Sequence, residues 1–133
     1  MRRVFLDTVG LIALWDVSDQ WHSFAAAAFA DLQETPFIAY TSLFVLLECA
    51  NSASRRPYRP LLTQLRRDME NDGLLMIPSP QQIEIAWKSY DNSAPGGPGI
   101  VDLVSFQVMR QFQCTDAFSN DAHFRAAGFV TLF

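Results

Sequence analysis

Apolar and polar residues along this chain follow two periodic patterns, which alternate from one segment to the next. Short β-rich runs predict strands at residues 3–6, 37–40, 74–77, 114–118 and 129–133. Apolar residues three and four positions apart predict helices at 8–14, 19–32, 58–71, 79–87 and 101–112, and after residue 42. Residues 121–126 predict a short turn or helix. This alternation favours an α/β fold, a three-layer α/β/α sandwich with a mostly parallel central sheet.

Length and composition indicate one domain that spans residues 1–133. Half of the residues are hydrophobic, which is ample for a single buried core. The sequence shows no internal repeat and no low-complexity tail. The segment Ser93–Gly99, with two prolines and three glycines, predicts a flexible loop that leads the chain to Asp102.

Three carboxylates are each the only charge within a long apolar stretch. They are Asp7, between Arg3 and Asp16; Glu48, between Glu34 and Arg55; and Asp102, between Asp91 and Arg110. A buried carboxylate is unstable by several kcal/mol unless a cation or a set of hydrogen-bond donors meets it. Several such acids in one small domain favour a shared metal ion.

The predicted layout indicates where these acids lie. Ligand sites of open α/β sheets lie beyond the carboxyl ends of the strands. Asp7 directly follows the first predicted strand, and Asp116 and Asp121 come at and just after the fourth. Glu48 and Asp102 lie on helices that follow connections from the sheet. We therefore expect all of these acids to reach one rim of the sheet.

Each acid also has a structural interpretation. Asp7, Asp102 and Asp121 stand where a helix cap or a turn residue is expected. Glu48 lies in an apolar helix interior, where capping is impossible, so its alternative is an ion pair with a distant arginine. For the two histidines, His22 and His123, the neighbouring residues favour structural roles.

The charge distribution limits the possible partners. The formal net charge of -4 argues against a protein that coats nucleic acid generally, because such binding needs excess Lys and Arg. A bound metal, however, reverses the local sign of an acidic pocket. Basic residues concentrate after the Glu48 helix, where Arg55, Arg56 and Arg59 either steer RNA toward a metal site or form a solvated face.

The sequence favours a reduced, cytoplasmic environment. Cys49 and Cys114 show no ligand-like spacing and are interpreted as reduced core residues. Arg2 and Arg3 precede an apolar segment, but Asp7 interrupts it and no convincing cleavage site follows, so we reject a secretion signal. No apolar run approaches the length that crosses a bilayer.

Four segments, in this order, resemble the PIN-domain family over essentially the whole chain. They are Val4–Thr8, Leu46–Asn51, Ile100–Arg110 and Ser119–Phe129, and the last two together resemble small toxins of the VapC type. The resemblance implies a divalent-metal-dependent endoribonuclease. It places Asp7, Glu48, Asp102 and Asp121 on the family's four acidic positions, and Thr8 on its hydroxyl position.

The chemistry of carboxylates agrees with this implication. Mg²⁺ and Mn²⁺ prefer oxygen ligands, and a bound ion makes hydroxide available from water near neutral pH. We expect Asp7 and Asp102 to be inner ligands and Glu48 to reach the metal directly or through water. Asp121 is expected to hold a second ion or a water, and Thr8 to donate to a carboxylate or to phosphate.

The preferred hypothesis is a toxin that cuts single-stranded RNA. The resemblance further implies an antitoxin partner, bound in a groove of the early helices, and a homodimer. Two alternatives remain open at this point: a housekeeping RNA-processing nuclease of the same fold, and a catalytically silent PIN-like module that only binds protein.

Overall fold

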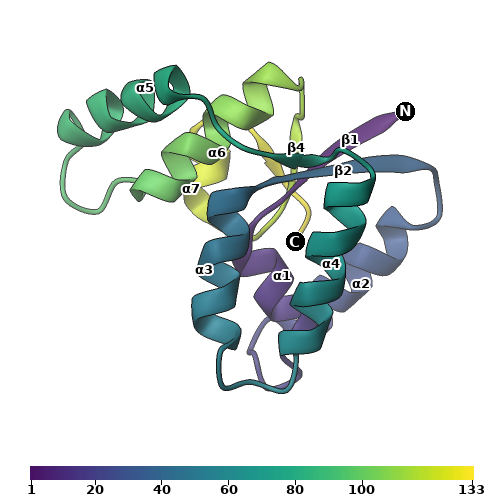
Figure 1. The fold of residues 1–133 in the computed structure, drawn as a ribbon. Coiled ribbons are helices and arrows are strands. Elements are labelled where there is room, and N and C mark those ends of the chain that lie inside the picture. The colour runs from purple at the N-terminus through teal and green to yellow at the C-terminus, as the bar shows by residue number, and fades with distance from the viewer.

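The computed structural model describes residues 1–133 and contains one five-stranded sheet between layers of helices (Figure 1). The strands are β1 (Arg2–Leu6), β2 (Phe37–Ser42), β3 (Leu75–Met76), β4 (Asp116–Phe118) and β5 (Val130–Thr131). All pairings are parallel, and the strand order is β3-β2-β1-β4-β5. The predicted α/β sandwich with a mostly parallel sheet is therefore confirmed.

Seven helices connect the strands and cover the sheet. They are α1 (Thr8–Trp15), α2 (His22–Leu32), α3 (Leu43–Ala53), α4 (Arg59–Asn71), α5 (Pro80–Asp91), α6 (Ile100–Gln111) and α7 (Ala122–Ala126). The helix α5 packs against α6 and projects beyond it from the body of the molecule (Figure 1). No helix combines the length and the apolar character that a membrane crossing requires.

Local sequence signals explain where several helices begin and end. The Ser42 hydroxyl accepts a hydrogen bond from the Val45 N–H and caps α3, and Ser79 forms a capping box with Gln82 at the start of α5. Gly73, with φ of 70°, ends α4 in the left-handed conformation that glycine tolerates.

The prediction for α2 was wrong at its start. The Asp19 carboxylate accepts a hydrogen bond from the Trp21 N–H at 2.8 Å, and the helix begins only at His22. This local turn competes with helix formation, which is a common property of aspartate.

The core lies on both faces of the sheet and is rich in aromatic residues. The largest fully buried side chains include Phe5 of β1, Phe118 of β4 and Phe124 of α7. Both cysteines are free and buried, and burial raises the pKa of the Cys49 thiol to about 12. A thiol with such a pKa stays protonated at neutral pH, so it behaves as a small core residue.

Candidate active site

Asp7 lies at the carboxyl end of the central strand and precedes α1. Its side chain is buried, with only 2% of the residue exposed, and its carboxylate makes no capping hydrogen bond to α1. Instead, the Ser119 hydroxyl donates to Asp7 Oδ2 at 2.8 Å. The structure thus gives Asp7 a buried position without the capping bond that the structural interpretation required.

Burial and repulsion both act on this carboxyl group. Burial raises the pKa of Asp7 to about 7, against the opposing effect of the Ser119 hydrogen bond, and the charges of Asp102 and Asp121 raise it further. Carboxylates that repel one another in the absence of a cation form a site that favours a bound cation.

Asp102 lies in the first turn of α6, directly after the Pro- and Gly-rich loop. Burial raises its pKa to about 6, and the charges of Asp121 and Glu48 add to the shift. Asp102 therefore couples electrostatically to all three of the other predicted acids. The structure brings the four carboxylates into one neighbourhood, although they come from four separate segments of the chain.

Glu48 lies on α3 and faces the start of α1. The Thr8 hydroxyl donates a hydrogen bond to Glu48 Oε1 at 2.6 Å. No lysine or arginine forms an ion pair with Glu48, since the two such pairs in the structure are Arg2–Asp116 and Arg66–Glu70. The structure therefore contradicts the alternative that Glu48 forms an ion pair with a distant arginine.

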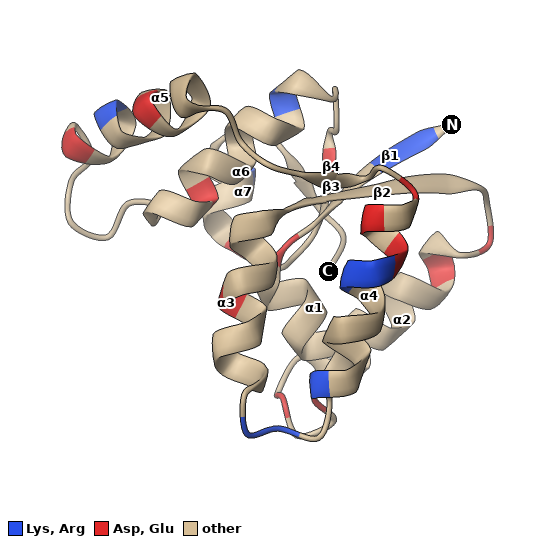
Figure 2. Cartoon of the chain, viewed as in Figure 1, with Lys and Arg blue, Asp and Glu red and all other residues tan.

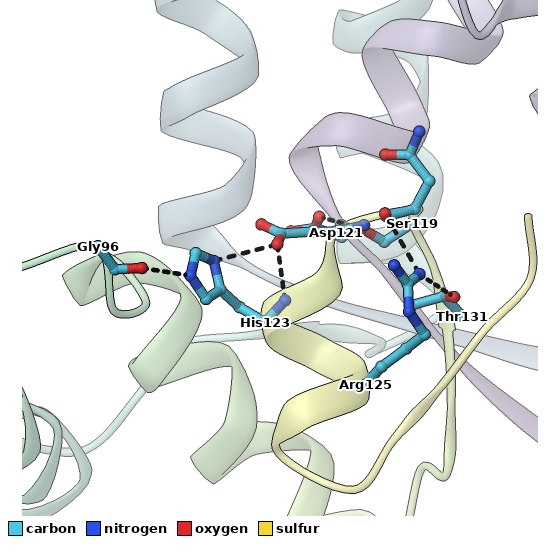
Figure 3. A network of polar contacts seen from close by, with 8 residues as sticks. Gly96, Ser119, Asp121, His123, Arg125 and Thr131 are labelled. Carbon is cyan, nitrogen blue, oxygen red and sulfur yellow. Dashed lines mark hydrogen bonds and ion pairs between the residues drawn. The ribbon is translucent and has the colours of Figure 1, made fainter.

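Asp121 belongs to a network of hydrogen bonds (Figure 3). Its Oδ1 accepts from the His123 N–H at 2.8 Å and lies 3.1 Å from His123 Nδ1, while its own N–H donates to Ser119 Oγ at 3.1 Å. His123 Nε2 is 2.9 Å from the Gly96 carbonyl oxygen. Through Ser119, this network continues to Asp7.

A close approach between α1 and β4 helps to hold these segments together. A Cβ atom on Gly10 would lie 1.9 Å from the main-chain oxygen of Phe118. Only glycine therefore lets α1 lie against the end of β4. The contact places Asp7 next to Ser119, which follows Phe118 directly.

Comparisons with known proteins support the fold. No family model and no curated protein matches the chain. Among solved structures, the chain is similar to Mycobacterium tuberculosis VapC20, described as a sarcin-ricin loop cleaving toxin. The TM-score is 0.80, the sequence identity is 27%, and the match covers 96% of each chain.

The chain is a VapC-type PIN-domain protein. Its fold and the order of its acidic segments agree with the resemblance seen in the sequence. In this VapC-type protein, the ligand atoms of Asp102, Asp121 and His123 all lie within 4.8 Å of one another. The donor set of carboxylates and one imidazole therefore suits a divalent cation.

One acid was placed wrongly by the sequence. Asp116 is the first residue of β4, pairs in register with Val4 and forms an ion pair with Arg2 at 2.6 Å. Because parallel strands run in one direction, the start of β4 lies at the opposite rim from the end of β1. Asp116 is therefore a structural ion-pair residue of this VapC-type protein, away from the four other acids.

The structure also adds two residues that sequence reasoning missed, Ser119 and His123. Ser119 is fully buried and joins Asp7 to Asp121, and its signal in the sequence is a polar residue directly after a buried strand. His123 was interpreted as structural, but it faces Asp121. His22 has the structural environment that was expected, with Nδ1 2.9 Å from the Ala13 carbonyl oxygen.

Arg55 and Arg56 lie in the turn between α3 and α4, and Arg59 is the first residue of α4, at the foot of both helices in Figure 2. All three are exposed, and Arg59 Nη1 donates to the Ser54 carbonyl at 3.1 Å. Arg55 follows Glu48 by seven residues, which corresponds to roughly 10 Å along a helix axis. This distance is comparable with the Debye length at physiological salt, so we expect any electrostatic effect of these arginines on the site to be confined mainly to low ionic strength.

Proposed function

We propose that this protein is a divalent-metal-dependent endoribonuclease that acts as the toxin of a toxin–antitoxin pair. One observation carries the proposal: four carboxylates from distant segments lie together without a lysine or arginine partner, and burial, with mutual repulsion added to it, raises the pKa of Asp7 and of Asp102. The similarity to VapC20 supports ribonuclease chemistry at this site.

The residues divide into ligands and groups that orient them. Asp7, Glu48, Asp102 and Asp121 would hold Mg²⁺ or Mn²⁺, which lowers the pKa of a bound water and offsets charge on phosphate. The buried Ser119 hydroxyl orients Asp7 by its hydrogen bond. Thr8 orients Glu48 in the same way, by donating to Oε1. The second carboxylate oxygen of Glu48 stays free to bind a metal ion or a water.

The deciding experiment compares matched Asp→Asn variants. Asp7→Asn and Asp102→Asn are expected to abolish Mn²⁺-dependent RNA cleavage and growth arrest on expression. Asp116→Asn, at the opposite rim, is the control and should retain both. Circular dichroism checks that each variant is folded. Full activity of the Asp7 and Asp102 variants would contradict the proposal.

VapC20 suggests the first substrate to test. Its description names the sarcin-ricin loop, so an RNA oligonucleotide of that sequence is the natural first substrate, followed by cleavage mapping on total RNA. A catalytically silent module would cut neither substrate and would gain no thermal stability from Mn²⁺. A housekeeping nuclease would cut RNA without arresting growth.

The proposal includes two protein partners. We infer a small cognate antitoxin and a homodimer, both from the resemblance to VapC-type toxins. Co-expression with the product of a neighbouring small gene, followed by light scattering of the purified protein and complex, tests both. A monomer at all concentrations would contradict the homodimer. Growth arrest that persists on co-expression would show that the co-expressed protein is not the antitoxin.

A further inference from the structure

His123 is held at both ring nitrogens. Nε2 is 2.9 Å from the carbonyl oxygen of Gly96, in the loop before α6, and Nδ1 is 3.1 Å from Asp121 Oδ1 (Figure 3). No other hydrogen bond from a side chain outside the Ser93–Gly99 loop reaches that loop. The ring therefore has a fixed position between the loop and the proposed metal centre.

The two contacts determine how the ring is protonated. A carbonyl oxygen only accepts, so Nε2 must carry the hydrogen and donate it to Gly96. In the neutral ring, Nδ1 then presents a lone pair toward a carboxylate oxygen at 3.1 Å. Two such acceptors repel unless a cation, either a proton or a metal ion, lies between or beside them.

A metal ion fits the surroundings in that role. The ligand atoms of Asp102, Asp121 and His123 lie within 4.8 Å of one another. Adjacent ligands of an octahedral ion, each at about 2.1 Å from it, lie about 3 Å apart. Histidines that bind metals also usually donate the other ring N–H to a carbonyl or carboxylate, as His123 does toward Gly96.

We infer that His123 is a nitrogen ligand of the proposed metal centre, together with Asp102 and Asp121, and that it makes this centre prefer Mn²⁺ over Mg²⁺. The inference rests on the proposed function for the existence of the centre. Mn²⁺ belongs to the first-row metals that bind mixed nitrogen and oxygen sites, although more weakly than the later ones, whereas Mg²⁺ prefers an all-oxygen site. Between these two ions, one nitrogen donor therefore shifts selectivity toward manganese.

The primary test measures Mn²⁺ bound to the wild-type protein by electron spin-echo spectroscopy. We expect nitrogen modulation from a coordinated histidine, which 15N-histidine labelling shifts. The chain has two histidines, so His22→Gln, which should retain the modulation, is the matched control for His123→Gln, which should lose it. Wild-type protein that binds Mn²⁺ without nitrogen modulation would overturn the inference.

Affinity supplies a second readout that does not depend on cleavage. His123→Gln is expected to weaken Mn²⁺ binding about tenfold or more, while Mg²⁺ binding changes by less than about threefold. Equal losses for both ions would indicate that His123 only orients Asp121, and would also overturn the inference. Failure of the proposed function is distinguishable, because the wild-type protein would then bind no divalent ion and cut no RNA.

Discussion

Replacing Asp7 by asparagine is expected to stabilise the metal-free protein at alkaline pH while removing its activity. The pKa of this buried carboxyl group is raised from 3.8 to about 7. At pH 8 the folded protein therefore holds an ionised group that is more stable in the water-exposed unfolded chain. Asparagine has nearly the same shape, carries no charge, and its amide oxygen can still accept the Ser119 hydrogen bond.

The magnitude follows from the two pKa values. Their difference corresponds to about 4 kcal/mol, at about 1.4 kcal/mol per pH unit. The pKa of Asp7 is higher in the folded protein than in the unfolded chain. Asp7 therefore contributes stability below roughly pH 4, and this contribution is lost as the pH rises to roughly 7. The wild-type free energy of unfolding should therefore fall over this range, and the Asp7→Asn variant should lack this fall.

Urea unfolding followed by tryptophan fluorescence measures this difference. The two proteins, in EDTA, should have similar free energies of unfolding near pH 4.5, and the variant should be more stable at pH 8. Asp31→Asn, at an exposed position of α2, is the control and should follow the wild type. Mn²⁺ should then stabilise the wild type and not the Asp7 variant. If the free energy of unfolding changed with pH in the same way for the wild type and for Asp7→Asn, the reasoning would be refuted.

Three further predictions concern the packing of α1 on β4, the orientation of Glu48 and the binding of RNA. Gly10→Ala should destabilise the protein by about 1–3 kcal/mol in urea unfolding, because its Cβ meets main-chain atoms of β4. Gly99→Ala, which has no atom within 4 Å of the new Cβ, should cost less, about 1 kcal/mol at most, from the weaker N-cap that alanine makes for α6. Thr8→Val should lower kcat about tenfold or more through misorientation of Glu48, and Thr8→Ser should restore it; equal rates for the two would contradict this role. Replacing the arginines at and near the α3–α4 turn by glutamine should raise KM at low salt and leave kcat unchanged. Each replacement should reduce the slope of the logarithm of the RNA-binding constant against the logarithm of salt concentration by about 0.7. The three positions are Arg55, Arg56 and Arg59.

The alternation of strands and helices was predictable because it depends on local periodicity and on local capping. Ser42 and Ser79 cap helices at the starts that the sequence predicted, and α4 ends at residue 71 as predicted, with Gly73 in the left-handed conformation after it. Strand ends were less predictable. The strands predicted at 114–118 and 129–133 contain only three and two residues in the sheet, because pairing partners, and not residue type, fix where a strand begins and ends.

The error at Asp116 has a structural reason. This acid stands at the middle of the predicted strand 114–118 and was grouped with the acids that follow a strand, but β4 begins at Asp116, so the acid lies at the amino end of the strand. Its partner Arg2 is 114 residues away, and no local pattern indicates such a pair.

The contacts of His123 with Gly96 and Asp121 were not predicted, for a similar reason. Its neighbour Phe124 is fully buried, and this favoured a packing role for the whole segment. In a helix, however, adjacent residues point in different directions, so Phe124 enters the core while His123 faces the loop that contains Gly96. The contact partner lies 27 residues earlier and was not evident from spacing.

The central place of β1 in the sheet has a consequence for the time at which activity appears during translation. This strand is synthesised first, yet one of its two neighbours, β4, is made more than a hundred residues later, and Ser119 and Asp121 follow β4. A nascent chain that lacks these residues has neither a complete sheet nor the network around Asp7. The ribosome therefore delivers an inert polypeptide until late in synthesis.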